Sequence, residues 1–283
     1  MNAFNAFLAK LTELVLAPFA GLPSQVPLVI LSAVAGVLAA IAFRYTSNQA
    51  ALKRVADQVR AALLGMRLFK DDLRSVFAAQ FSLFKASGLR LWYSLPPLVV
   101  LIVPFVLLLV QLGMWYEFRP LAPGQSALVE VEVAPEMWET HGGLELGVPD
   151  GVVVESLVRN AHDRLVTWRI RPQRAAGADE PLELRLRLGE REIAAKQLVV
   201  REDPDASVLT FVSPRRPGSG FWDRLVYPGE PGFDESSPVR AISIDYGSRT
   251  NTIFGLRLPW WATFFVVSIL AALAIKPVVK VQF

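Results

Sequence analysis

Three long apolar runs constrain this chain more than any other feature of its sequence. They cover Val26–Phe43, Leu95–Leu112 and Leu258–Ile275. Each comes close to the roughly 20 residues that a helix needs to cross the hydrocarbon core of a bilayer. They also explain a hydrophobic content of 53%, which is high for a water-soluble protein. We therefore expect an α-helical membrane protein with three transmembrane helices, at residues 24–44, 94–116 and 256–276.

The segment before the first run is predicted to be an amphipathic helix. Residues 1–22 place apolar side chains at helical spacing, and Pro18 and the Gly21-Leu22-Pro23 turn would end the helix. Such a helix would lie on the outer face of the membrane as an anchor. No basic region precedes the first run, so we interpret that run as a retained anchor and not as a secretory signal. The apolar positions are Phe4, Phe7, Leu8, Leu11, Leu14 and Val15.

The charges on the two long connections predict how the helices are oriented. Residues 44–93 carry nine basic and three acidic side chains, whereas residues 115–257 carry 17 basic and 22 acidic ones. Basic connections stay in the cytoplasm, so the first connection is expected inside and the second outside. Lys276 and Lys280 then place the C-terminus in the cytoplasm, which leaves the N-terminus outside.

Residues 45–93 are predicted to form a basic helical arm in the cytoplasm. Two stripes of apolar residues recur in it at helical spacing. Two antiparallel helices packed as a coiled-coil-like hairpin would bury both stripes. One long helix that folds back on the bilayer surface is the alternative. The stripes consist of Leu52, Val55, Val59, Leu63 and Met66, and of Leu73, Val76, Phe77, Phe81 and Phe84.

The basic residues of this arm are expected to face water, anionic lipid or an acidic partner such as ribosomal RNA. Like charges repel one another, so they require one of these surroundings. Simple solvation and a partner contact both stay open at this point. The residues predicted to contact the ribosome or lipid are Lys53, Arg54, Arg60, Arg67, Lys70 and Arg74.

Between residues 120 and 250 the pattern changes to an alternation of apolar and polar residues, which is typical of half-buried strands. Turn sequences such as Pro149-Asp150-Gly151 separate the strands. We predict an extracytoplasmic all-β domain with an immunoglobulin-like sandwich fold. The expected strands lie at residues 128–133, 165–171, 182–188, 192–200 and 239–246.

A long loop is predicted at residues 213–238, where Pro, Gly and Arg are frequent. An apolar cluster lies inside this loop. We expect the cluster to dock on the sandwich, and contact with the membrane is the alternative. The cluster consists of Phe221, Trp222, Leu225, Val226 and Tyr227.

The sequence shows no arrangement of residues that indicates catalysis. The chain has no cysteine and only two histidines, His141 and His162. Neither has a third ligand nearby, so a metal site is not expected. No phosphate-binding glycine loop and no G-x-S-x-G elbow is present. We therefore expect neither enzyme activity, nor a cofactor, nor a small-molecule substrate.

Polar residues at the edges of the apolar runs are the remaining candidates, because ionisable groups in a bilayer are costly and usually functional. Arg44 ends the first run and Gln111 lies near the end of the second. A stop signal whose guanidinium reaches the headgroups explains Arg44 simply. The functional interpretation points Arg44 inward between helices. Gln111 and the pair Trp260-Trp261 fit either helix contacts or an interfacial aromatic belt.

The first apolar run ends in Phe43-Arg44-Tyr45-Thr46-Ser47-Asn48-Gln49 and is followed by the basic arm and a second apolar run. This order resembles the YidC-type membrane protein insertase superfamily, and most closely its minimal three-span branch with archaeal and endoplasmic-reticulum relatives. The resemblance covers residues 24–118 and, more loosely, the closing helix. It implies a groove open to cytosol and lipid, with Arg44 and Gln111 as client-contact residues. The β domain would be a surface insertion between the second and third helices.

The resemblance implies a factor of the bacterial inner membrane that assists the insertion of transmembrane segments. Its partners would be membrane lipids, nascent membrane proteins and the ribosome. The alternative is a membrane-anchored interaction or accessory protein whose outer β domain binds a partner, for which other membrane proteins are candidates. The first interpretation places the function in residues 24–118 with the third helix, and the second places it in residues 125–248.

Overall fold

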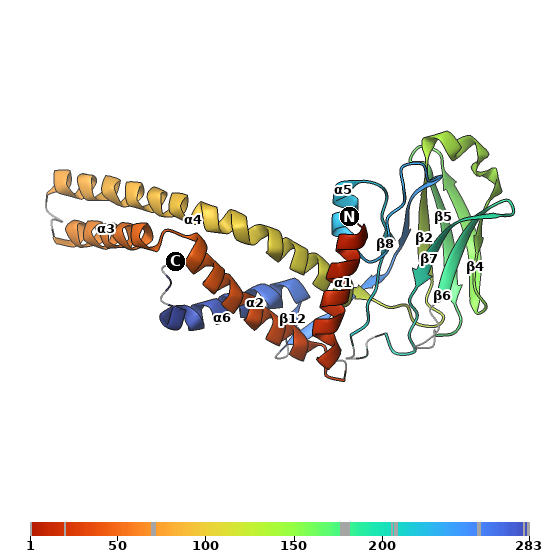
Figure 1. The fold of residues 1–283 in the computed structure, drawn as a ribbon, viewed down its shortest axis with the longest axis horizontal. Helices are drawn as coiled ribbons and strands as arrows, with labels where there is room; N and C mark the ends of the chain where they lie inside the picture. Colours follow the sequence, from red (N-terminus) through yellow and green to blue (C-terminus); the bar gives the residue numbers. More distant parts are fainter. Residues whose placement is uncertain are drawn as a thin grey trace. The chain divides into compact units, whose positions relative to one another are not determined.

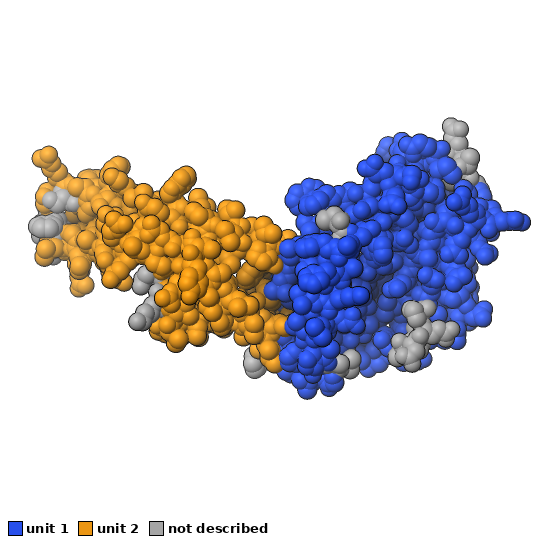
Figure 2. Space-filling model, in the orientation of Figure 1, with its two compact units in different colours: residues 1–27, 107–260 blue, residues 28–106, 261–283 orange. Residues whose placement is uncertain are grey.

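The computed structural model describes the backbone of residues 2–19, 21–68, 72–175, 182–204, 206, 209–253, 256–279 and 281. The chain forms two compact units, coloured separately in Figure 2. Unit 1 comprises residues 1–27 and 107–260, and unit 2 comprises residues 28–106 and 261–283. Unit 1 contains the strands, whereas unit 2 contains most of the long helices.

Among the described residues, three helices are long and apolar enough to cross a membrane, which confirms that part of the sequence prediction. They are α2 (Gln25–Thr46), α4 (Leu73–Tyr116) and α6 (Trp260–Val279). At 44 residues, α4 is one continuous helix through the second half of the expected arm and the second expected span. Pro96, Pro97 and Pro104 lie inside it without ending it. Proline is tolerated in apolar helices where local adjustments satisfy the freed carbonyl groups.

Within unit 2, α2 and α6 approach each other closely at Gly36. A Cβ atom added to Gly36 would lie 2.1 Å from the backbone oxygen of Ser268. Helices in lipid associate through close packing at such small residues, because water does not drive them together there. Phe105 of α4 also packs edge-on against Phe264 of α6, with ring centroids 6.0 Å apart. Gly36 is therefore the point where a side chain of any size would separate the two helices.

The helix α3 (Gln49–Leu68) lies beside the first part of α4 in unit 2 (Figure 1). A Cβ atom on Gly65 of α3 would lie 3.8 Å from the Cβ atom of Ala79 of α4, which is ordinary contact. Small and aliphatic residues face inward, and Ala62 of α3 and Ala86 of α4 are both buried. The small residues Gly65 and Ala79 mark a point where the two helices meet.

The predicted burial of both apolar stripes is therefore wrong for the phenylalanines of the second stripe and for Leu63 of the first, which is 51% exposed. Leu52 and Val55 of the first stripe are buried. The three phenylalanines of the second stripe are instead exposed, whereas Val76, Ala79 and Leu83 are partly buried. Spacing alone fits either face of α4, and the face with the smaller side chains packs more tightly. The exposed fractions of Phe77, Phe81 and Phe84 are 67%, 74% and 69%.

Unit 1 holds two antiparallel sheets around one apolar core. A five-stranded sheet has the order β4-β5-β2-β9-β8, and a three-stranded sheet has the order β3-β6-β7. The strands of these sheets are β2 (Ala127–Val133), β3 (Leu144–Gly147), β4 (Val152–Asn160), β5 (Leu165–Pro172), β6 (Leu182–Leu188), β7 (Arg191–Leu198), β8 (Arg215–Arg216) and β9 (Val239–Ile244). The five strands expected from alternation all form.

Shorter elements complete the described part of the chain. The strands β1 (Phe118–Arg119) and β10 (Gly247–Ser248) pair with each other, as do β11 (Asn251–Ile253) and β12 (Leu256–Leu258). Four short helices occur: α1 (Asn2–Leu16), η1 (Ala17–Phe19), η2 (Pro135–Gly143) and α5 (Phe221–Val226).

The core of unit 1 follows the period of two in its strands. In β2 the buried positions alternate with partly or fully exposed ones, and the same holds for β5 and β6. Alternation arises because successive side chains of a strand point to opposite faces of the sheet. Representative core residues are Val129, Val131, Trp168, Ile170, Leu184 and Leu186.

The segment 213–238 is tied to β7 by buried charge. Lys196 of β7 donates hydrogen bonds to the carbonyl oxygen of Ser213, at 2.6 Å, and to the carboxylate of Glu230. The side chains of Lys196 and Glu230 are only 1% and 8% exposed. Burial lowers the pKa of the Lys196 ammonium, and the charge of Glu230 offsets part of that effect. Arg216 adds a hydrogen bond of 2.6 Å to the carbonyl oxygen of Ala195.

The apolar cluster in this segment departs from the expected docking. Phe221 and Trp222 begin α5 and are 56% and 73% exposed, and Val226 is exposed too. Only Leu225 and Tyr227 of the predicted cluster are partly buried. The segment is held by its charged residues instead, so its aromatic side chains are left on the surface.

Tyr246 gives the β domain a predicted sensitivity to high pH. Its buried hydroxyl accepts a hydrogen bond of 3.0 Å from the backbone N–H of Val199. Burial raises the pKa of the phenol above its ordinary 10.0, so the folded state holds the proton more tightly than the unfolded state. The stabilisation that the protonated phenol gives the folded state is complete below pH 10.0 and is lost as the pH rises through the higher pKa of the folded state.

We expect Tyr246→Phe to destabilise the domain by about 1 kcal/mol near neutral pH, because the N–H of Val199 loses its partner. The difference in the free energy of unfolding between the variant and the wild type should narrow above pH 10.0, because only the wild type has a phenol that ionises. Unfolding at a series of pH values measures both effects. A difference that widens at high pH would contradict this assignment.

Candidate functional site

The sequence around Arg44 forms a compact corner between α2 and α3. Asn48 accepts a hydrogen bond of 3.0 Å from the N–H of Ala51 through its side chain, and so caps the N-terminus of α3. The hydroxyl groups of Thr46 and Ser47 donate to carbonyl oxygens one turn back in α2. The polar residues after Arg44 thus have a structural task, in which they end one helix and start the next.

Arg44 itself is exposed on the last turn of α2. Its guanidinium carbon lies 5.9 Å from the centre of the Tyr45 ring, which is within the range of a cation–π contact. A basic group at a helix C-terminus also interacts favourably with the helix dipole. Gln111 lies in unit 1 while Arg44 lies in unit 2, so the two predicted client-contact residues belong to separate compact units.

The basic residues of α3 include a row on its outer face. Lys53, Arg60 and Arg67 recur every seven residues and are exposed, so they lie along one line of the helix. Arg60 forms an exposed ion pair of 3.3 Å with Asp57. Arg54 and Arg74 are exposed elsewhere on the arm, and Lys70 lies outside the described residues. The row therefore gives α3 one exposed, positively charged side.

We name Phe77, Phe81 and Phe84 the aromatic stripe. Their spacing of four and three residues places them on one face of α4. The more buried residues Val76, Ala79, Leu83 and Ala86 lie on the roughly opposite face, and Ala79 among them lies next to Gly65 of α3. Burying a side chain of this kind contributes roughly 1.5–3 kcal/mol, so three of them side by side form a surface able to bind apolar material. Sequence reasoning found these residues but assigned them to the interior.

The C-terminal end of α4 is fixed to the β domain within unit 1. The backbone N–H of Val212 donates to the carbonyl oxygen of Met114 at 2.8 Å. Tyr116 stacks on Trp260 with ring centroids 6.2 Å apart, and the indole N–H of Trp260 donates to the Glu117 carboxylate at 2.8 Å. Within unit 1, these contacts hold residues 114–117 and Trp260 to the β domain.

Gln111 is buried near this joint. Its side-chain carbonyl oxygen has no hydrogen-bond partner among the described residues. Leu112 and Met114 beside it in the sequence are buried as well. This position fits a helix contact better than an exposed interfacial belt, of which Trp261, at 51% exposed, is the better member.

Other polar groups of the apolar helices are mostly satisfied within their own helix. Ser32 donates to the carbonyl oxygen of Leu28, and Ser268 donates to that of Phe264, each at 2.6 Å. The hydroxyl group of Ser94 likewise donates to the backbone carbonyl oxygen of Arg90 at 2.9 Å. Such local bonds leave little polar surface for a client, and Thr263 is a described exception whose buried hydroxyl has no partner.

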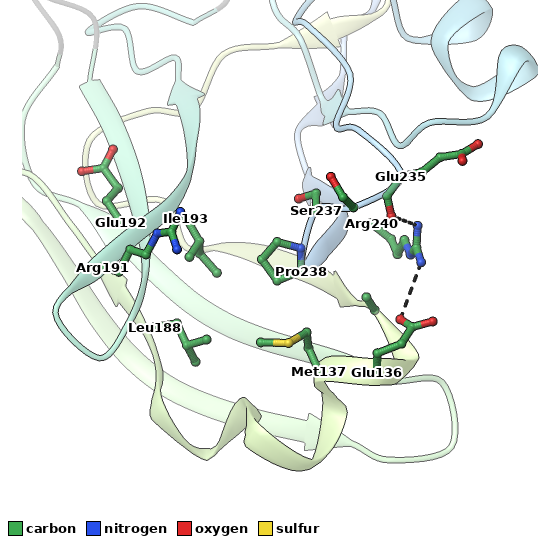
Figure 3. Close-up of a pocket in the computed structure, with 12 residues that line it drawn as sticks. Glu136, Met137, Leu188, Arg191, Glu192, Ile193, Glu235, Ser237, Pro238 and Arg240 are labelled. Atoms are coloured by element: carbon green, nitrogen blue, oxygen red, sulfur yellow. Dashed lines mark hydrogen bonds and ion pairs between the residues drawn. The ribbon is translucent and has the colours of Figure 1, made fainter.

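An open hollow of about 570 Å³ lies on the β domain (Figure 3). Met137, Leu188, Ile193 and Pro238 line it, and charged residues surround them. Arg240 is 3.7 Å from the Glu136 carboxylate and donates to the carbonyl oxygen of Glu235 at 3.0 Å. The opposite charges compensate each other, and the described lining residues contain no pairing of nucleophile and base.

No protein-family model matches this chain, and no curated protein matches it in sequence.

Proposed function

We propose that this protein assists the insertion of transmembrane segments into a bacterial inner membrane. The aromatic stripe on α4 is the observation that carries the proposal. It is an exposed apolar surface on the same helix that continues into the second apolar segment. A hydrophobic segment bound there would have a continuous helical path toward the bilayer.

The proposal includes the orientation and fold class expected from the sequence. The α3–α4 pair is taken as a cytoplasmic hairpin, and the β domain as an extracytoplasmic sandwich of immunoglobulin-like type. The row formed by Lys53, Arg60 and Arg67 would then meet the ribosome or anionic headgroups, since both carry negative charge. Arg44, exposed at the end of α2, would attract the acidic flank of a client.

The step that such a protein performs is physical. Moving a short polar flank across a bilayer is costly, and burial of the client helix in lipid supplies the driving force. The protein contributes a first binding surface for the apolar segment and a basic group near the polar one. No covalent chemistry is needed.

A photocrosslinking residue at Phe81 tests the proposal. We expect it to crosslink to ribosome-bound chains only while a hydrophobic segment is emerging, because Phe81 lies in the centre of the exposed stripe. Ser82 is the matched control, since it is exposed on the same helix but lies outside the stripe. Equal crosslinking at both positions, or crosslinks from Phe81 to lipid alone, would contradict a client-binding role.

The triple change Phe77→Ser, Phe81→Ser and Phe84→Ser should lower client insertion into proteoliposomes about tenfold, since loss of about 1.4 kcal/mol of binding free energy already weakens an equilibrium by that factor. The folded amount of the protein should stay constant, because the three side chains are exposed. Insertion at the wild-type rate would remove the stripe from the mechanism.

A second candidate function, an anchored interaction protein, is favoured by β4. This strand lies at the edge of the five-stranded sheet, and it was not among the strands expected from the sequence. It exposes Val154 and Leu157 on one face and Val153 and Val158 on the other. An apolar edge strand is suited to pair with a strand of a partner protein. A photocrosslinker at Val158 that captures one stable neighbour, with none captured at Phe81, would favour this function.

A further inference from the structure

The helix α1 packs on the rest of unit 1 through its less apolar side. Asn5 and Leu16 are buried, and Ala9 and Thr12 between them are partly buried. These four positions follow helical spacing and define the inner face. The outer face is apolar and exposed, with Phe7 and Leu14 62% and 70% exposed. An amphipathic helix in water normally places these two sides the other way round.

A side-chain hydrogen bond joins α1 to α5. The amide group of Asn5 donates to the backbone oxygen of Arg224 at 2.7 Å, and the N-terminal part of α1 lies beside α5 (Figure 1). Arg224 is held in turn, because its guanidinium donates to the backbone oxygens of Gly218 and Phe233 at 2.9 and 2.6 Å. The two helices therefore form one surface element, although more than 200 residues separate them in sequence.

Both helices present aromatic side chains on this element. Phe221 and Trp222 of α5 meet edge to face, with ring centroids 5.2 Å apart, and both are exposed. Phe4 and Phe7 of α1 are exposed as well. Trp and Phe with an apolar body are favoured at the level of lipid headgroups and the adjoining acyl chains.

Chain connectivity indicates which material covers these side chains. Only residues 17–24 separate α1 from α2, which is apolar and long enough to cross a membrane. A connection of that length spans at most about 28 Å even when fully extended. The C-terminal end of α1 therefore stays within that distance of the start of α2, and the bond from Asn5 ties α5 to the same helix.

We propose that α1 and α5 form a single lipid-binding surface, through which the β domain is held against the bilayer. The apolar stripe of α1 and the Phe221–Trp222 pair enter the interfacial region of one leaflet together. The bond between Asn5 and Arg224 couples the two insertions. This role is independent of the proposed insertion activity, and it assigns a function to α5 that concerns the β domain alone.

The chain contains no cysteine, so a single introduced cysteine can carry a nitroxide label. We expect labels at Trp222→Cys and Phe7→Cys, in full-length protein in lipid nanodiscs, to collide with dissolved oxygen more often than with a water-soluble nickel complex. A label at Val158→Cys, on the exposed edge strand of the same unit, should show the reverse. The nickel collision rate at position 222 should be several-fold lower than at position 158.

Equal nickel collision rates at positions 222 and 158 would overturn the proposal, and they would leave a protein partner as the occupant of α5. The change Asn5→Ala tests the coupling in the same assay. It should raise the nickel collision rate at position 222 and leave that at position 7 low, because α1 remains anchored through α2. Unfolding temperatures of the labelled variants should match the wild type, since Phe7, Trp222 and Val158 are all exposed.

Discussion

Replacement of Gly36 by leucine is expected to break the packing of α2 against α6. An added Cβ atom would lie 2.1 Å from the backbone oxygen of Ser268 and 2.8 Å from its Cα atom. Backbone atoms cannot turn aside as a flexible side chain does, so the helices must separate. Overpacking commonly costs about 1–3 kcal/mol, and we expect Gly36→Leu to exceed that range. The unfolding temperature in lipid nanodiscs measures the loss.

Gly88→Ala is the matched control for this prediction. Gly88 also lies inside a long helix, α4, but apart from its chain neighbours and the nearby backbone of its own helix, no described atom lies within 4 Å of a Cβ atom added there. Alanine in a helix is favoured over glycine by about 0.5–1 kcal/mol, so this variant should be slightly more stable than the wild type. If Gly36→Leu behaves like Gly88→Ala, the close approach of α2 and α6 does not exist in the membrane.

Lys196→Met is expected to produce the largest loss of stability in the β domain. The change leaves the carboxylate of Glu230 buried without its ammonium partner. Breaking a buried ion pair by removing one partner costs about 3–5 kcal/mol. The effect should also release residues 213–238 from β7, because Lys196 bonds to Ser213 as well. Hydrogen exchange of the β7 amides in the full-length protein measures the free energy of opening.

Two further variants separate the buried charge from a general effect of mutation. Arg185→Met removes an arginine that is 56% exposed and pairs with Glu183, and it should change stability by less than about 1 kcal/mol. Lys196→Met combined with Glu230→Leu should recover most of the loss, because no unpaired charge then remains. A double variant as unstable as Lys196→Met would show that shape, and not charge, makes Lys196 necessary.

In the β domain, the alternation of apolar and polar residues predicted the core strands but not the edge strand β4. Alternation in the strands that include Val129, Trp168 and Leu184 predicted their position and their buried face, because one face of each meets the core. The edge strand β4 carries Val152, Val153 and Val154 in succession, so it shows no alternation to detect. Edge position is a property of the whole sheet and leaves no signature in the strand itself.

The candidate site was predicted less well. The exposed basic row of α3 was identified from composition, since charged side chains rarely enter a core. The spacing of the aromatic stripe was recognised, but the stripe was predicted to be buried. Hydrophobicity alone favours burial of Phe81, whereas in the structure the smaller Ala86 is buried and Phe81 is exposed. The polar residues after Arg44 looked functional, yet Asn48 caps α3.

Length and hydropathy alone determined that this chain has three helices able to cross a membrane, since the thickness of a bilayer fixes the length of apolar helix that spans it. Alternation likewise determined five of the eight strands in the two main sheets of the β domain. Tertiary structure alone decided which residues meet across long stretches of sequence, such as Lys196 with Glu230 and Asn5 with Arg224. It also decided which face of α4 is covered. Such pairings depend on shape and on the distance between groups in the folded chain, and local patterns carry neither.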